Sequence, residues 1–325
     1  MRDRKILGNA LLILTAMIWG TAFVFQRTGM ESIEPITFNA ARMALAAVAV
    51  GAVSVVTAPA EKKRFAGERI TGPGERISGS NGEVTGPGER ITGPGEEQRR
   101  AYNRNTVIGG ICCGTFLAAA SIFQQMGIVY TTAGKAGFIT AMYMLLVPVI
   151  GTVFFHKRNS WIVWLAVLIG VAGMYLLCMT EEFRLTRGDT LVCICALLFS
   201  GHILCCDHFV QLGDPIRISA IQFAACTVLS AIAAVILEQP TWDKIVSAAI
   251  PILYCGLISG GLGYTLQISA QKFTDPTIAS LLMSLESVFA VIAGALLLGE
   301  RMSTRELMGC VVMFAAIVLV QIRGE

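Results

Sequence analysis

Blocks of about 20 mostly apolar residues recur along this chain of 325 residues, and they constrain its fold more than any other feature. About 20 apolar residues is the length of an α-helix that crosses a hydrocarbon core of roughly 30 Å. Only 14% of the residues are charged, whereas roughly 25% are charged in an ordinary soluble domain. A soluble fold would leave too much apolar surface in water, so the sequence predicts a protein that crosses a membrane many times.

Helices, not strands, are expected for these blocks. Backbone polar groups in lipid must be paired within the segment or in a closed barrel. The blocks are too long and too uniformly apolar for the alternating strands of about ten residues that build barrels. We therefore expect an all-α polytopic membrane protein with ten transmembrane helices. The expected spans are residues 6–26, 35–57, 106–129, 134–155, 160–179, 189–207, 216–237, 246–269, 276–298 and 305–322.

The distribution of Lys and Arg predicts the orientation, because these residues favour the cytoplasmic connections of membrane proteins. With the N-terminus placed inside, 17 of the 25 lie on the inner side and 6 on the outer side. Nine of the inner ones lie in residues 59–104, and the bias keeps its sign without them. We therefore expect a plasma (inner) membrane protein with both termini in the cytoplasm.

The ten cysteines lie in or beside the apolar blocks, where they act as small apolar packing residues. The run Cys205-Cys206-Asp207-His208, with His202 nearby, superficially resembles a metal site. Adjacent cysteines on a helix cannot readily bind one ion together, and no second pair has the spacing of a zinc site. The sequence therefore predicts neither a metal nor a cofactor, and His202 as a proton relay is the less favoured interpretation.

The chain contains an internal repeat. The segment that begins at Ala16 is similar to the one that begins at Ala196, an offset of 180, and Gln125 later matches Gln267 at an offset of 142. The change in offset falls at the long connection between the second and third spans. Because each half has an odd number of spans, the halves enter the membrane with opposite polarity, as in inverted-repeat transporters. The expected halves are residues 1–58 with 105–180, and residues 188–322.

The connection between the second and third expected spans, residues 59–104, is low in complexity. Residues 67–96 repeat short motifs such as GERITGPG and contain few large apolar side chains. Such a segment cannot bury a core, so we expect a disordered cytoplasmic loop. A repeat expansion tolerated at the surface explains it more simply than a regulatory motif, because long loops cost little entropy.

Four segments resemble signature segments of one family. Residues 18–24 read IWGTAFV and resemble its first-helix signature; residues 38–44 read FNAARMA and are similar to its second-helix segment, in which Arg42 is the arginine. Residues 131–148 and 284–300 resemble its fourth-helix and ninth-helix segments. The family is the EamA-like family of the drug/metabolite transporter superfamily, and the resemblance extends over all ten spans.

The resemblance implies a secondary transporter, an exporter or exchanger of small organic metabolites such as amino acids or related compounds. The inverted repeat suits alternating access to a site near the membrane midplane. The expected partners are a small-molecule substrate and the lipid bilayer, with protons if transport is coupled to them. Nucleic acid is not expected, and the sequence does not decide between a monomer and a homodimer. The alternative is a non-transporting membrane sensor or an intramembrane enzyme. We find no catalytic pair in the spans, so no enzymatic activity is expected.

Glu286 is the strongest candidate site residue, because an ionisable group inside a span is expensive and therefore often functional. It lies about ten residues into the ninth span, too deep to reach the interface. One interpretation is a carboxylate that couples protons or binds a substrate amine. The other is a structural partner of a basic residue or a serine on a neighbouring helix.

Two basic residues within the spans are further candidates. Lys135, at the outer start of the fourth span, could attract a substrate carboxylate, or its ammonium could reach the interface along an extended side chain. Arg42 lies about two turns below the outer edge of the second span. A structural tie is favoured for Arg42, because Asn39 is near enough to satisfy its polar groups locally.

Neutral polar and aromatic residues complete the predicted site. Individually, each glutamine is explained by interhelical hydrogen bonds, worth about 0.6 kcal/mol on average. Together with aromatic surface, the set favours a cavity that suits amphipathic metabolites. The leading candidates of this set are Trp19, Gln125, Tyr143, Tyr264 and Gln267, and Phe23, Gln124 and Gln271 are its further members.

Overall fold

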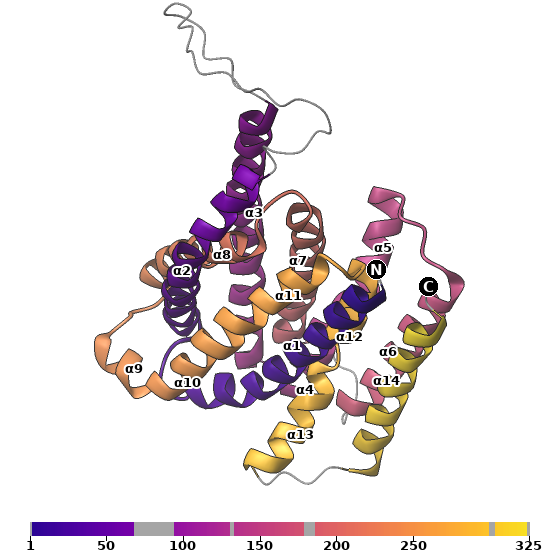
Figure 1. Ribbon diagram of the computed structural model, residues 1–325. Coiled ribbons are helices and arrows are strands. Elements are labelled where there is room, and N and C mark those ends of the chain that lie inside the picture. Colours follow the sequence, from indigo (N-terminus) through magenta and orange to yellow (C-terminus); the bar gives the residue numbers. More distant parts are fainter. Residues whose placement is uncertain (1, 68–93, 131–132, 179–185, 299–302, 324–325) are drawn as a thin grey trace, which may run out of the picture.

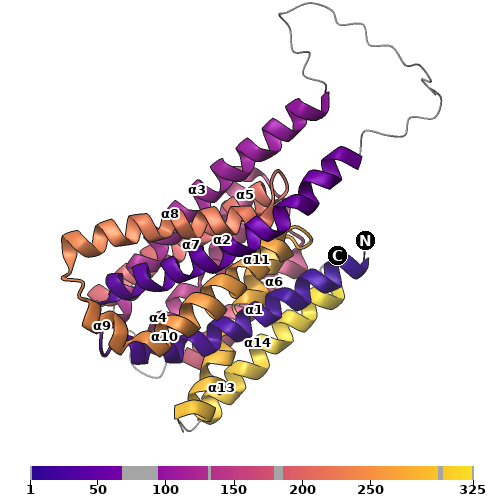
Figure 2. The same cartoon turned by 60° about the vertical axis from the view of Figure 1, so that its left-hand side comes forward.

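The structure, a computed structural model, describes residues 2–67, 94–130, 133–178, 186–298 and 303–323 (Figure 1). Within these ranges the chain consists of helices joined by short connections, and no β-strand occurs in them. The long helices run side by side and cross the bundle in alternate directions (Figure 2). The start of α1 and the end of α14 therefore lie at the same end of the bundle.

The helices of the first part of the chain are α1 Arg2–Gly29, α2 Pro35–Gly67, α3 Pro94–Tyr130, α4 Ala133–Ala141, α5 Tyr143–Phe155 and α6 Trp161–Cys178. Those of the second part are α7 Arg187–Val210, α8 Pro215–Leu237, α9 Trp242–Ser247, α10 Ala249–Leu253, the π-helical segment η1 Tyr254–Tyr264, α11 Thr265–Gln271, α12 Pro276–Met283, α13 Glu286–Leu298 and α14 Thr304–Arg323.

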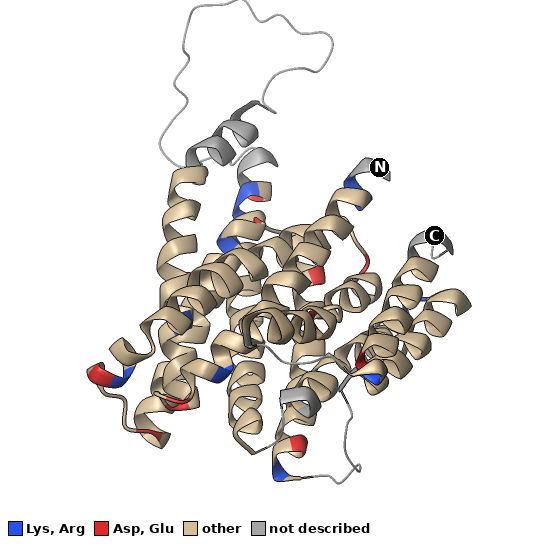
Figure 3. Ribbon diagram, turned by 90° about the horizontal axis from the view of Figure 1, so that it is seen from below, with Lys and Arg blue, Asp and Glu red and all other residues tan. Residues whose placement is uncertain are grey.

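Helical segments lie at all ten of the expected spans, and eight of them are long and apolar enough to cross a membrane within the described ranges. The fifth expected span corresponds to α6, whose apolar part, Trp161–Leu176, is shorter. The tenth corresponds to α14, which does not meet the same criterion. Charged residues are sparse along the helices and gather near their ends (Figure 3). The chain is therefore an all-helical, multi-pass membrane protein, and the number ten stays a prediction.

The predicted loop at residues 59–104 is shorter than expected. Helix α2 continues to Gly67, and helix α3 begins at Pro94, so both ends of that range are helical. The two helices project side by side beyond the rest of the bundle (Figure 2). Loss of apolar character marks where a span leaves the hydrocarbon core, but a helix can continue into water past that point. Most of the repetitive motif, residues 68–93, lies outside the described residues.

Two of the expected spans are interrupted at their middle. The fourth is divided at Met142 into α4 and α5, and the ninth at Ser284 and Leu285 into α12 and α13. Hydrogen bonds between residues three apart tighten the chain at each point, from Leu145 N to Met142 O and from Leu285 N to Leu282 O. Each interruption lets the following half-helix begin inside the bundle.

The eighth expected span contains the π-helical segment η1. Four of its residues are glycines, and Gly263 permits a close approach, because a Cβ there would lie 2.7 Å from Trp19 Nε1. The Trp19 indole donates a hydrogen bond to Ser259 O at 3.1 Å, and the Thr15 hydroxyl donates one to Gly263 O at 3.4 Å. Side chains of α1 thus satisfy carbonyls of this wider helix, which is a type of element often found at functional sites.

Helix α6 packs along α14 at one edge of the bundle (Figure 1), and glycine permits this contact. A Cβ at Gly173 in α6 would lie 2.8 Å from Met313 N and 3.0 Å from Gly309 O in α14. Both neighbours are backbone atoms, so they cannot move aside easily. Gly51 in α2 offers a contrast, since nothing lies within 4 Å of a Cβ there.

We predict that Gly173→Ala destabilises the protein and that Gly51→Ala does not. Overpacking a close contact typically costs about 1–3 kcal/mol, whereas alanine in place of an unhindered helical glycine is neutral or gains up to about 1 kcal/mol. Melting temperatures of the purified variants in detergent measure the difference. Equal melting temperatures for the two variants would contradict the α6–α14 packing described here.

Candidate functional site

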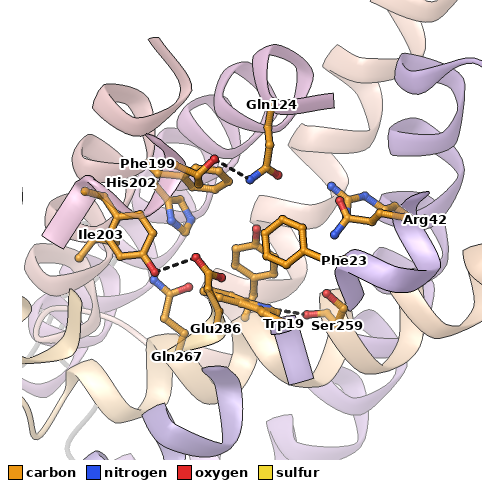
Figure 4. Close-up of a pocket in the computed structure, with 14 residues that line it drawn as sticks. Trp19, Phe23, Arg42, Gln124, Phe199, His202, Ile203, Ser259, Gln267 and Glu286 are labelled. Atoms are coloured by element: carbon orange, nitrogen blue, oxygen red, sulfur yellow. Dashed lines mark hydrogen bonds between the residues drawn. The ribbon is translucent and has the colours of Figure 1, made fainter. Parts of the chain in front are cut away.

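A cavity lies in the interior of the bundle, between helices from both parts of the chain (Figure 4). The space that no atom fills amounts to about 510 Å³, counted with the solvent at its mouth. Its wall combines aromatic rings, amides, hydroxyls and two groups of opposite formal charge. The lining residues are Trp19, Phe23, Gln26, Arg42, Gln124, Thr140, Tyr143, Phe199, His202, Ile203, Ser259, Tyr264, Gln267 and Glu286.

Glu286 supplies the carboxyl group of the wall. It is the first residue of α13, and 5% of its surface is exposed. Its Oε1 accepts a hydrogen bond from Tyr143 Oη at 3.0 Å, and Tyr143 is the first residue of α5. The two half-helices that begin inside the bundle thus meet through the side chains of their first residues. The helix interruptions place both groups at the cavity instead of within an uninterrupted span.

Arg42 supplies the positive charge. It lies on α2 with 4% of its surface exposed, and its Nε and Nη2 donate to Asn39 Oδ1 at 3.0 and 2.8 Å. Asn39 Nδ2 in turn donates to Ser121 Oγ on α3 and to Ser230 Oγ on α8, both at 2.9 Å. Three helices therefore fix the guanidinium at the wall. The local tie between Arg42 and Asn39 is the one expected from the sequence.

Glu286 and Arg42 face one cavity without forming an ion pair. In the described part of the chain, no carboxylate lies within 4.0 Å of the Arg42 guanidinium, and no basic group lies within 4.0 Å of Glu286. Buried charges are costly unless they are paired or bound to a partner. Two separated charges of opposite sign therefore suit a ligand that carries both an anionic and a cationic group.

Aromatic side chains form the apolar part of the wall. The rings of Trp19 and Tyr264 lie 4.6 Å apart between centroids, and the Tyr264 ring also meets His202 edge to face at 5.9 Å. Phe23 and Phe199 add further apolar surface. Such faces hold apolar groups and also attract cations. The site therefore offers both charge recognition and apolar contact.

The residues predicted for the site do not all reach it. Of the eight leading candidates, six lie on the cavity wall: Trp19, Arg42, Tyr143, Tyr264, Gln267 and Glu286. Gln125 is buried behind the wall, where its Nε2 donates to Gln26 Oε1, and Gln26 is the residue that faces the cavity. Lys135 lies in the first turn of α4, and its side chain is outside the described part.

Several wall residues were not predicted as members of the site. Five of them are neutral residues inside apolar helices, and their residue type alone does not mark them as members of a site: Gln26, Thr140, Phe199, Ile203 and Ser259. Gln124 and Phe23, by contrast, belong to the predicted polar and aromatic set and lie on the wall, whereas Gln271 is not among the lining residues. His202 also lies on the wall, and its Nε2 is 3.0 Å from Gln222 Oε1. The rotation of each helix, which decides these cases, follows only from packing.

Two ion pairs lie at opposite ends of the bundle. Lys244 in α9 pairs with Glu34, which follows the end of α1. Lys157, which follows α5, pairs with Asp207 near the end of α7 at 2.8 Å. Because consecutive helices cross the bundle in alternate directions, the first pair lies at one end and the second at the other. Each pair joins the first part of the chain to the second.

These features together define a multi-pass helical membrane protein with a charged and aromatic cavity in its interior. The sequence also matches a profile of the EamA-like transporter family over residues 6–68, 94–179 and 186–322. The chain therefore belongs to the EamA-like transporter family.

Two further comparisons agree with this membership. An uncharacterized transporter of Archaeoglobus fulgidus is 30% identical over 205 residues, which are 62% of this chain and 64% of that protein. The alignment thus spans less than two thirds of the relative. A protein of known crystal structure has a TM-score of 0.72 at 13% identity, over 100% of this chain and 98% of that one. At this identity the likeness shows the fold alone.

We predict that the Glu34–Lys244 pair stabilises the protein in a pH-dependent way. The hydrogen bond from the Lys244 ammonium holds the pKa of the Glu34 carboxyl below its usual value of 4.5. A lowered pKa in the folded state gives stability above the unfolded value, and this stability is lost as the pH falls through the folded value. Glu34→Gln should therefore cost up to about 1 kcal/mol at pH 7 and nothing at the acid end.

Melting temperatures of wild type and Glu34→Gln between pH 3 and pH 8 measure this difference. Lys244→Met is the matched control and should give the same profile, with no further loss in the double variant. A difference that is independent of pH would show that the carboxylate charge does not contribute.

Proposed function

We propose that this protein is a secondary transporter that moves small organic metabolites, amino acids or related compounds, by alternating access. The observation that carries the proposal is the pair of separated opposite charges, Arg42 and Glu286, on one buried cavity wall. An amino acid bears a carboxylate and an ammonium group, which match these two charges. The aromatic wall around Trp19 and Tyr264 suits an apolar side chain.

The second part of the proposal is that ten helices form two inverted halves. The offsets in the sequence relate α1 to α7, α2 to α8, α3 to the α10–η1–α11 span, α4–α5 to α12–α13, and α6 to α14. The packing supports these relations: α3 packs on α7 and α8, while η1 packs on α1 and α2. Likewise α1 packs on α12 and α13, while α7 packs on α4 and α5. Each main contact thus has a counterpart when the halves are exchanged.

The relation between the halves extends to the site itself. Gly151 and Gly294 match at an offset of 143, and the same offset relates Tyr143 to Glu286. Both residues begin a half-helix at the cavity, and they contact each other. We infer that the pseudo-two-fold axis passes near this hydrogen bond. A site on such an axis lies equally near both membrane faces, which suits alternating access.

The two ion pairs would act as gates. Glu34–Lys244 and Lys157–Asp207 each join the two halves, at opposite ends of the bundle. Opening the cavity to one side would separate one pair while the other stays closed. Both pairs are partly exposed, and surface pairs are worth little, about 0–1 kcal/mol, so thermal motion or a bound substrate can break them.

Direction and location complete the proposal. The Lys and Arg distribution favours cytoplasmic termini in a plasma membrane, and α1 begins at the end of the bundle where α14 stops. Export or exchange of a metabolite then uses the gradient of the substrate or of protons, with Glu286 as the group that exchanges a proton.

An intramembrane enzyme is the less favoured alternative. It would rest on Cys206, whose Sγ lies 3.5 Å from His202 Nε2. Cys206 is fully buried and does not belong to the cavity wall, so a substrate in the cavity would not reach its sulfur. For a sensor that uses residues 59–104 as its output, the described ends of that segment, residues 59–67 and 94–104, show helix only.

We predict that Glu286→Gln lowers transport at least tenfold and flattens its dependence on pH, because the amide binds no proton and carries no charge. Abundance should be kept, since no basic group within 4.0 Å loses its partner in the described residues. Uptake by vesicles at several pH values, beside melting temperature, makes the measurement. Glu31→Gln, an exposed carboxyl outside the cavity, is the control.

Two results would contradict the proposal. Wild-type transport and an unchanged pH profile in Glu286→Gln would remove Glu286 from the mechanism. A large loss of melting temperature, with normal transport by the protein that remains folded, would make it a structural residue only.

A further inference from the structure

The orientation of the Gln267 side-chain amide is fixed by a chain of hydrogen bonds. Gln271 Nε2 donates to Ile203 O at 3.0 Å, and a backbone carbonyl can only accept. Gln271 Oε1 therefore faces Gln267 and accepts from Gln267 Nε2 at 3.2 Å. The remaining group of Gln267, its Oε1, must be directed away from this chain. The backbone carbonyl of Ile203 thus determines which end of the Gln267 amide carries the oxygen.

Gln267 Oε1 is a buried acceptor without a partner. The residue is 1% exposed, and no donor in the described part of the chain makes a hydrogen bond to this oxygen. A buried acceptor left unpaired is costly, and such groups in native proteins usually have a ligand or a water. Gln267 lines the cavity, where Figure 4 shows its side chain beside that of Glu286.

Two acceptors therefore face the same part of the cavity. Among the described residues, Glu286 accepts a hydrogen bond from Tyr143 at Oε1, and its carboxylate has the capacity to accept more. Gln267 adds a neutral oxygen next to it. The aromatic faces of Trp19 and Tyr264 are part of the same wall. This arrangement suits a cation with several N–H donors.

We propose that Gln267 Oε1 and the Glu286 carboxylate together bind a primary ammonium group, and that Gln267 makes the site selective for primary over N-methylated amines. The inference rests on the proposed function and assigns a role to one residue of that site. A primary ammonium has three N–H donors, whereas a trimethylated ammonium has none. Glu286 and the aromatic faces attract either cation through its charge, whereas Gln267 Oε1 carries no net charge and gains chiefly from an N–H donor.

The repeat supplies a matched control residue. Gln125 corresponds to Gln267 at an offset of 142, and its Oε1 is likewise a buried acceptor without a partner among the described residues. Gln125 does not belong to the cavity wall, and its Nε2 donates to Gln26, which does. Substitution of Gln125 therefore removes an equivalent unpaired acceptor outside the wall, and any shift of Gln26 would affect both probes alike.

The test measures binding of two probes to the purified full chain in lipid nanodiscs. The probes are L-phenylalanine and its N,N,N-trimethyl derivative, and the variants are Gln267→Met and Gln125→Met. Hydrogen bonds to charged groups contribute enough for about a tenfold change in affinity. We expect Gln267→Met to weaken L-phenylalanine binding about tenfold and to leave the trimethyl derivative unchanged. Gln125→Met should leave the ratio of the two affinities unchanged.

A second variant keeps the inference testable if Gln267→Met folds poorly. Gln271→Leu removes the hydrogen bond that orients Gln267 and leaves the cavity wall untouched. The released amide can turn, so discrimination between the probes should fall in the same direction by a smaller factor.

The outcomes separate this inference from the proposed function. Binding of L-phenylalanine to the wild type with unchanged discrimination in Gln267→Met overturns the inference alone, and a water then satisfies the oxygen. An equal loss of affinity for both probes in Gln267→Met also overturns it, because Gln267 would then only maintain the shape of the cavity. Failure of both probes to bind the wild type overturns this inference together with the proposed substrate class.

Discussion

A carboxyl group in the middle of a membrane protein constrains everything around it, because neither lipid nor apolar side chains can replace its water. Here Glu286 begins a half-helix inside the bundle and accepts a hydrogen bond from Tyr143, which begins another. The helix interruptions exist at the places where these two groups need to face a cavity. Across that cavity Arg42 is held by Asn39, and among the described residues no carboxylate lies within 4.0 Å of it. In the proposed function, a ligand supplies the partners of these two charges.

The proposed relation between the two halves gives these details a common origin. An ancestral half would carry one interrupted helix with a polar residue at its first position. Two copies facing each other would bring these positions together near the axis, where they would have diverged to tyrosine and glutamate. The glutamines of the third and eighth spans would have diverged as well, because Gln267 lies on the wall and Gln125 lies behind Gln26. Under this proposal, divergence at related positions turns a symmetric framework into a site with a cationic and an anionic side.

The length and order of the apolar blocks were enough to predict the helices, because a membrane allows few other folds. The contact between Arg42 and Asn39 was also predictable, since residues three apart lie on the same helix face. Other features depend on packing. The sequence gives Gln125 and Gln267 the same weight, and only the rotation of each helix decides which one lines the cavity. Ser259 enters the site through a carbonyl of a π-helical segment, and no side-chain pattern indicates that. The prediction missed the helical ends of residues 59–104. Polar residues show where a span leaves the hydrocarbon core, but they do not show where the helix ends.

The central claim is that one cavity opens to both sides of the membrane in turn. Gln124 lines this cavity and bears no charge, so a cysteine there reports access with little disturbance of the two charged groups. In a cysteine-depleted variant with Gln124→Cys, a membrane-impermeant maleimide can be applied to right-side-out and to inverted vesicles. A cysteine at position 243, an exposed residue of helix α9 outside the proposed gate pair, serves as the control for vesicle orientation. The account predicts labelling of position 124 from both sides and labelling of position 243 from one side only. Labelling of position 124 from a single side at every pH, in protein that transports normally, would contradict it.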